Sequence, residues 1–185
     1  EQVNLILGFK GVDYFSDLYY ATALYSTVLG SGMSSRLFQE IREKRGLVYS
    51  ISSYSSSFTD SGVFGIYAGT GSEEIKELIP VLCDQLNIHT SSFTPDELKR
   101  AKAQFKSSLL MGKESTSVRA RSNATQKLLY NRIIDDEERM KKINAITLED
   151  LEKARLNIIQ SPLTISAIGP IKNLDSHNKI LKRFN

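Results

Sequence analysis

The most informative segment of the chain covers residues 30–54 and reads Gly30-Ser-Gly-Met-Ser-Ser-Arg-Leu-Phe-Gln-Glu-Ile-Arg-Glu-Lys-Arg-Gly-Leu-Val-Tyr-Ser-Ile-Ser-Ser-Tyr54. Ser34 is a residue type that caps helix N-termini, and Gly46 is a residue type that ends helices. Between them we expect a helix over residues 36–45, whose buried side carries Leu37, Phe38 and Ile41. The β-branched, aromatic and serine residues after Gly46 predict that a strand begins at once.

Two polar side chains flank the expected reversal. Arg42 lies in the last turn of the helix and Tyr49 near the start of the strand, seven residues later. Arginine offers a planar fork of donors and tyrosine a single O–H donor, which together suit a peptide carbonyl or the oxyanion that develops on it. From these residues alone a structural interpretation is the better one, because a last-turn arginine favours the helix dipole and a strand tyrosine is commonly part of a core or sheet face.

Strand-like runs of apolar, β-branched and aromatic residues occur at four places in the chain: residues 3–9, 47–57, 62–69 and 163–168. The second and third runs are separated by Thr59-Asp-Ser-Gly62, which is typical of a turn, and we expect them to form a hairpin.

Helix signals fill most of the remaining sequence. Residues 14–28 predict a buried helix, for which Gly30 is expected to provide a left-handed end. Thr94-Pro95-Asp96-Glu97 is a capping box with proline at the first helical position, and Thr147 resembles another cap. The layout predicts an α+β fold, with one mostly antiparallel sheet and helices packed on one side. Residues 1–185 are expected to form one domain, since no internal linker is visible.

Composition excludes several classes of function. The net charge of +3 comes from 24 basic and 21 acidic residues that are mostly interspersed, so we do not expect a nucleic-acid partner despite a pI near 8.9. No run of about 18 apolar residues is present, which predicts no membrane span. The single cysteine, Cys83, allows no internal disulfide and lies in an apolar stretch, where a buried structural role is expected.

Known metal and nucleophile motifs are missing from the sequence. The two histidines, His89 and His177, lie far apart, and neither has a second ligand at helical spacing. No G-x-S-x-G elbow or Walker motif occurs either. We therefore predict neither a metal site nor a cofactor site within this chain.

The sequence from Gly32 to Ser50 strongly resembles the signature of the C-terminal domain of pitrilysin/insulinase-type (inverse-zincin) zinc peptidases, especially the mitochondrial-processing-peptidase branch. Weaker similarity continues in Tyr67–Thr70, Thr94–Lys102 and Ile165–Pro170, so that the resemblance spans nearly the whole chain. Enzymes of this family are built from two similar α+β halves that close around a peptide. The first residues form a strand-like run without an initiator methionine, and we expect this chain to be a fragment of a longer one.

The resemblance implies a role for each residue of the Arg42–Tyr49 pair. Arg42 would hold a backbone carbonyl of the peptide substrate, and Tyr49 would donate to the tetrahedral oxyanion. The zinc ion and the general-base glutamate would belong to the N-terminal half, supplied by the same chain or by a separate subunit. This half would therefore be the substrate-binding and oxyanion-stabilising part of a zinc metalloendopeptidase that cleaves peptides or presequences, and it would be inactive alone.

Two other functions remain open from the sequence. The family contains non-catalytic structural or assembly subunits, and a plain peptide- or protein-binding module would share the same fold. Neither cleavage specificity nor localisation is fixed, although a soluble compartment such as the cytoplasm or an organelle matrix is the expectation.

Overall fold

A computed structural model of the chain describes residues 1–184, without the side chain of residue 90. Its centre is a four-stranded sheet in the order β2-β3-β1-β4, and every pairing in it is antiparallel. The strands are β1 (Gln2–Lys10), β2 (Ser50–Ser57), β3 (Gly62–Gly71) and β4 (Thr164–Ile168). The predicted hairpin of β2 and β3 and the predicted final strand are both present.

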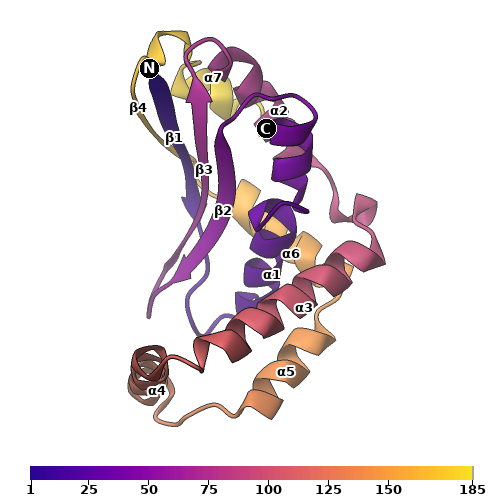
Figure 1. The fold of residues 1–185 in the computed structure, drawn as a ribbon, viewed down its shortest axis with the longest axis vertical. Coiled ribbons are helices and arrows are strands. Elements are labelled where there is room, and N and C mark those ends of the chain that lie inside the picture. The colour runs from indigo at the N-terminus through magenta and orange to yellow at the C-terminus, as the bar shows by residue number, and fades with distance from the viewer. Residues whose placement is uncertain (185) are drawn as a thin grey trace.

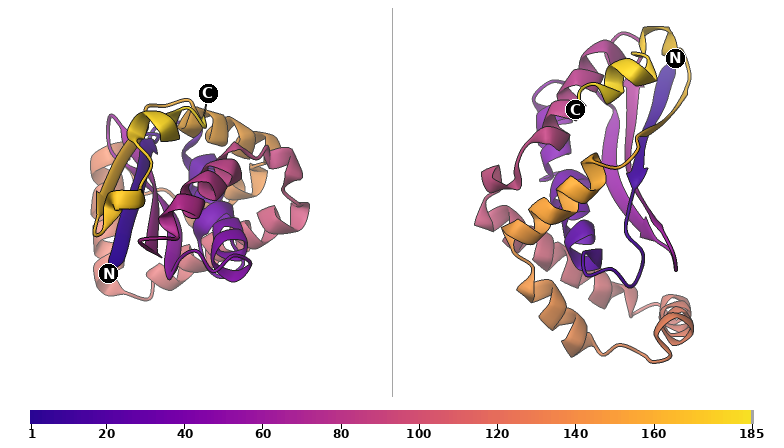
Figure 2. Two further views of the ribbon diagram at one scale, coloured as in Figure 1. Left: turned by 90° about the horizontal axis from the view of Figure 1, so that it is seen from above. Right: turned by 180° about the vertical axis from the view of Figure 1, so that it is seen from behind.

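Helical elements make up most of the rest of the chain. They are α1 (Tyr19–Gly30), η1 (Phe38–Glu43), α2 (Ile75–Asn87), η2 (Thr90–Ser92), α3 (Pro95–Gly112), α4 (Thr116–Tyr130), α5 (Asp136–Ala145), α6 (Leu148–Ile159), η3 (Ile171–Asn173) and α7 (His177–Leu181). The helices pack on one face of the sheet, while α3, α4 and α5 form a lobe that extends beyond its end (Figures 1 and 2). The predicted α+β class, with helices on one side of an antiparallel sheet, is confirmed.

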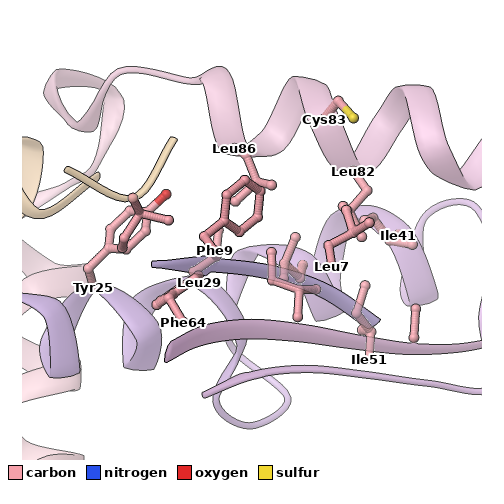
Figure 3. Close-up of a cluster of buried hydrophobic side chains, with 14 of the residues drawn as sticks. Leu7, Phe9, Tyr25, Leu29, Ile41, Ile51, Phe64, Leu82, Cys83 and Leu86 are labelled. Atoms are coloured by element: carbon pink, nitrogen blue, oxygen red, sulfur yellow. The ribbon is translucent and has the colours of Figure 1, made fainter. Parts of the chain in front are cut away.

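The core lies between the sheet and the helices. Alternate residues of β1 are buried, as period-two patterning requires for a sheet with one covered face. Leu7 and Phe9 of β1 and Phe64 of β3 meet Tyr25 of α1 and Leu86 of α2 in one cluster, in which each is at most 3% exposed (Figure 3). Burial of this kind is the main force that fixes the helices on the sheet.

Helix α1 begins later than its sequence predicts. We expected a helix over residues 14–28, but α1 starts at Tyr19. The preceding backbone is held in turns: the Asp13 carboxylate accepts a hydrogen bond of 2.8 Å from the N–H of Phe15, and the N–H of Tyr19 donates to the Ser16 carbonyl. Short polar side chains compete with helix formation in this way.

The end of α1 corrects a second expectation. Gly30 does not provide the left-handed end: the next residue, Ser31, is extended, and the positive φ of +84° belongs to Gly32. Gly30 serves a different purpose, because a Cβ atom on it would lie 2.4 Å from the backbone nitrogen of Ser53 in β2. The glycine therefore allows close approach of α1 to the sheet.

Candidate functional site

The Arg42–Tyr49 segment forms a sharp corner between a helix and the sheet. Its helix begins near Arg36 as predicted, but from Phe38 to Glu43 it widens into the π-helical turn η1. The expected Ser34 cap is not formed: η1 has no side-chain cap, and the neighbouring hydroxyl of Ser35 donates to the carbonyl of Gly32 at 2.7 Å instead of accepting from a backbone N–H. A π-helical segment is uncommon and often occurs at functional sites.

Gly46 ends this helix, as the sequence predicted. Its φ of +63° is left-handed, and its N–H donates to the Arg42 carbonyl at 3.0 Å. The N–H of Leu47 then reaches back to the carbonyl of Ile41 at 3.1 Å. Because Ile41 and Leu47 are both buried, these bonds fix the direction in which the chain leaves the helix.

The strand arm of the corner is tied to β3. The hydroxyl of Thr70 donates to the Leu47 carbonyl at 2.6 Å, and the N–H of Tyr49 donates to the Gly69 carbonyl at 2.8 Å. Thr70 is fully buried. Both arms of the reversal are therefore held by backbone hydrogen bonds and by buried side chains, so that the corner is a fixed platform for what it carries.

Two donor side chains project from this platform. Tyr49 is 66% exposed, and Arg42 is exposed with its guanidinium 4.7 Å from the centroid of the Phe38 ring. Neither side chain forms a hydrogen bond or an ion pair with any residue in the described part of the chain. The guanidinium fork and the phenol O–H therefore both remain available as hydrogen-bond donors.

A contact that the sequence did not predict anchors the other end of the same helix. The Nε and NH2 atoms of Arg36 donate to the two carboxylate oxygens of Glu97 at 2.8 and 2.9 Å, and NH2 also donates to the carbonyl of Ser92 at 2.8 Å. The guanidinium lies 4.0 Å from the centroid of the Phe93 ring. Such bidentate, stacked arginine contacts are geometrically specific.

Glu97 links this contact to helix α3. Its Oε2 also accepts from the N–H of Thr94 at 2.6 Å, and its own N–H donates to the Thr94 hydroxyl at 3.1 Å. This confirms the predicted capping box. Burial raises the pKa of Glu97, but the hydrogen bonds from Arg36 and Thr94 outweigh it and hold the pKa below its usual value. The carboxylate is therefore ionised at neutral pH and can serve both partners.

The described residues offer no place for a metal ion. Within residues 1–184, no three His, Cys, Asp or Glu side chains lie close enough together to hold one. His89 Nδ1 lies 3.0 Å from a carboxylate oxygen of Glu152, His177 Nε2 lies 2.9 Å from the carbonyl of Leu163, and Cys83 is buried. These side chains do not fit the donor set of a zinc site. Likewise, no helix of the described chain is long and apolar enough to cross a membrane.

The structure thus combines an antiparallel sheet covered on one face with a donor-bearing corner at the start of its edge strand β2. A family model described as "Peptidase M16 inactive domain" matches residues 1–105, more than half of the chain and the part that includes the corner. The chain belongs to this family. The resemblance drawn from residues 32–50 is thereby confirmed.

Individual relatives agree with this assignment. An "Uncharacterized zinc protease" of Rickettsia felis is 39% identical over 171 residues, which are 92% of this chain and 42% of that protein. A "Probable mitochondrial-processing peptidase subunit alpha-2, chloroplastic/mitochondrial" of Arabidopsis thaliana is 30% identical over 156 residues, which are 84% of this chain and 31% of that protein. The chain therefore spans less than half the length of these relatives.

The fold also occurs in solved structures. A chain of "Complex III2 from Candida albicans, Inz-5 bound" superposes with a TM-score of 0.88 and 23% identity, covering 99% of this chain and 46% of that one. The similarity at this level of identity concerns the fold, and it includes the whole arrangement of sheet and helices described above.

Proposed function

We propose that this chain is the substrate-binding and oxyanion-stabilising half of a zinc-dependent metalloendopeptidase. The observation that supports the proposal most strongly is the pair of unpartnered donors, Arg42 and Tyr49, on one fixed corner inside the segment that matches the peptidase family. Relatives named as zinc proteases favour a peptide as the substrate and zinc as the metal of the complete enzyme. The zinc-binding half would be part of the same chain or of a separate subunit.

Each donor has a distinct task in this proposal. Arg42 binds a backbone carbonyl of the bound peptide through its planar fork, which positions the scissile bond. Tyr49 donates its O–H to the oxygen of that bond as negative charge develops on it, and a donor already aimed at this position needs no reorganisation during the reaction. Zinc, held by residues of the other half, would supply Lewis-acid chemistry.

Replacing Arg42 by alanine tests the binding task. In the complete enzyme, the loss of charge-assisted hydrogen bonds should lower kcat/KM for an unstructured peptide by about 10–100-fold, the equivalent of roughly 1.5–3 kcal/mol. Arg45→Ala is the matched control: this arginine lies three residues further on and is occupied by the carbonyl and carboxylate of Glu40. Its kcat/KM should stay within about twofold of wild type.

The alternatives predict other results. A structural or assembly subunit would cleave no peptide even when the zinc-binding half is present. A plain peptide-binding module would bind unstructured peptides equally well in wild type and in Arg42→Ala. Equal values of kcat/KM for Arg42→Ala and Arg45→Ala would contradict the role given to Arg42.

A further inference from the structure

The lobe formed by α3, α4 and α5 is loosely filled. It lies at the end of the molecule opposite the N-terminus, and α4 forms its outermost part (Figure 1). Gln126 is the one residue of α4 that is buried; its side-chain amide donates to the hydroxyl of Ser122 and accepts a hydrogen bond from the N–H of Ile134. Leu128 is 85% exposed. Since interiors normally pack densely, an apolar space left open beside such a helix requires an explanation.

An open hollow of about 320 Å³ separates α4 from the start of α1. Three tyrosines from the α1 side line it, namely Tyr14, Tyr19 and Tyr20, and α4 contributes Val118 and Leu129. The tyrosine rings are fixed against one another: the centroids of Tyr19 and Tyr20 are 5.1 Å apart at an interplanar angle of 85°. The volume falls at the lower end of the roughly 300–1,000 Å³ range of small-ligand pockets.

Two arginines also line this hollow, Arg121 from α4 and Arg139 from α5. Arg139 is half-buried, and neither guanidinium forms an ion pair or a hydrogen bond with any residue among those that the structure describes. A partly desolvated cation without a partner is unfavourable. An anion placed between the two helices would relieve this cost and gain charge-assisted hydrogen bonds.

Nearby carboxylates do not fulfil that role. Glu138, next to Arg139 in sequence, is bound by Arg132 at 2.6 Å and by Lys142 at 3.3 Å. Asp136 is paired with Lys113. Glu138 and Asp136 therefore have other cations, and none of the described carboxylates lines the hollow beside its two arginines.

The Tyr19 phenol in the wall of the hollow stays neutral. Burial, reinforced by the neighbouring phenols, raises the pKa of Tyr19 to about 12, although Arg139 opposes the shift. A neutral O–H can donate to an anion, and the ring beside it provides an apolar surface. The hollow thus combines cationic forks, neutral donors and aromatic walls.

We propose that this hollow is a binding site for a small carboxylate with an aromatic or branched apolar body. The carboxylate is held by the guanidinium of Arg139, with Arg121 as the second cation, and the apolar body lies against the tyrosine rings and the aliphatic residues of α4. The site is separate from the Arg42–Tyr49 corner and does not depend on the function proposed for it.

A matched pair of ligands tests the proposal on the full-length protein. Naphthoate has an aromatic body and one carboxylate, whereas naphthamide has the same body without the charge. In calorimetric titrations we expect one naphthoate to bind per chain, and naphthamide to bind about tenfold to a hundredfold more weakly, as expected for the loss of a charged hydrogen-bonding group. No binding of naphthoate, or equal affinity for the two compounds, would overturn the proposal.

Matched variants locate the site. Arg139→Gln and, independently, Arg121→Gln should each weaken naphthoate binding at least about fivefold, because each removes one charged partner of the carboxylate. Arg100→Gln is the control, since this exposed arginine of α3 does not line the hollow. Val118→Phe should abolish binding by filling the space. Thermal unfolding followed by circular dichroism checks that each variant is folded, and naphthoate affinity that is unchanged in both arginine variants refutes the site.

Discussion

Replacing Arg36 by methionine should destabilise the protein by about 2–3 kcal/mol, which is below the 3–5 kcal/mol of a fully buried broken pair and within the range for charged hydrogen bonds. The side chains of Arg36 and Glu97 are 20% and 16% exposed, so the carboxylate left behind is largely but not fully desolvated. It would keep the N–H of Thr94 as a partner. Methionine retains an apolar stem that can rest on Phe93, so the loss is chiefly that of the charged fork.

The same variant has a defined pH dependence. The pKa of Glu97 in the folded protein lies below its ordinary value, since the bonds from Arg36 and Thr94 outweigh the effect of burial. The stability that the pair contributes is therefore fully present above the unfolded-state pKa, about 4.3, and is lost as the pH falls through the folded-state value. The difference between wild type and Arg36→Met should be constant near neutral pH and shrink below about pH 4.

Urea unfolding followed by circular dichroism measures both effects. Arg45→Met is the control, because Arg45 pairs with Glu40 at 3.2 Å with side chains 37% and 28% exposed. An ion pair of this kind contributes only about 0–1 kcal/mol. If the two variants lost the same free energy of unfolding, or if the Arg36→Met difference persisted unchanged at low pH, the account of the Arg36–Glu97 contact would be refuted.

Two further predictions concern the core. Gly30→Ala should lower the free energy of unfolding by about 1–3 kcal/mol, because the new methyl group would overpack against Ser53. Gly46→Ala has open space around the new methyl group and should lower it by only about 1–2 kcal/mol, through backbone strain at a φ of +63°. Equal losses in the two variants, together with a structure of Gly30→Ala in which α1 and β2 have not moved apart, would contradict overpacking as the cause. Burial raises the pKa of the Cys83 thiol to about 12, so a thiol-specific reagent at pH 8 should modify the native protein roughly 1,000-fold more slowly than the urea-unfolded protein, and equal rates would show that the thiol is accessible.

Local chemistry explains which elements the sequence predicted correctly. The capping box at Thr94 and the left-handed Gly46 depend on hydrogen bonds between residues only a few positions apart, and both are present as expected. The late start of α1 is also local, since it follows from hydrogen bonds at Asp13 and Ser16 that compete with the helix. The role of Gly30 is not local. Gly30 is required by β2, which passes beside it 23 residues later in the sequence, at Ser53. No local pattern distinguishes that requirement from a helix end.

The candidate site likewise has features that the local sequence predicted and features that depend on residues distant in the sequence. The sequence placed Arg42 and Tyr49 on the two arms of a reversal, which the structure has, but spacing alone could not indicate that both side chains would remain free of partners. The contact between Arg36 and Glu97 joins residues 61 positions apart and could not be read from either segment. The hollow beside Arg139 is lined by residues of four helices, α1, α3, α4 and α5, so it was likewise invisible in the sequence.

The most direct test of the central claim is the kcat of Tyr49→Phe in the complete enzyme, compared with that of Tyr54→Phe. Tyr54 is another exposed tyrosine of the same strand region, so its variant removes an equivalent hydroxyl away from the corner. If Tyr49 donates to the developing oxyanion, its variant should lose roughly 10²–10³ in kcat, the effect of one missing oxyanion donor, while Tyr54→Phe stays near wild type. A kcat of Tyr49→Phe equal to that of wild type would contradict the claim that this half contributes a donor to the reaction.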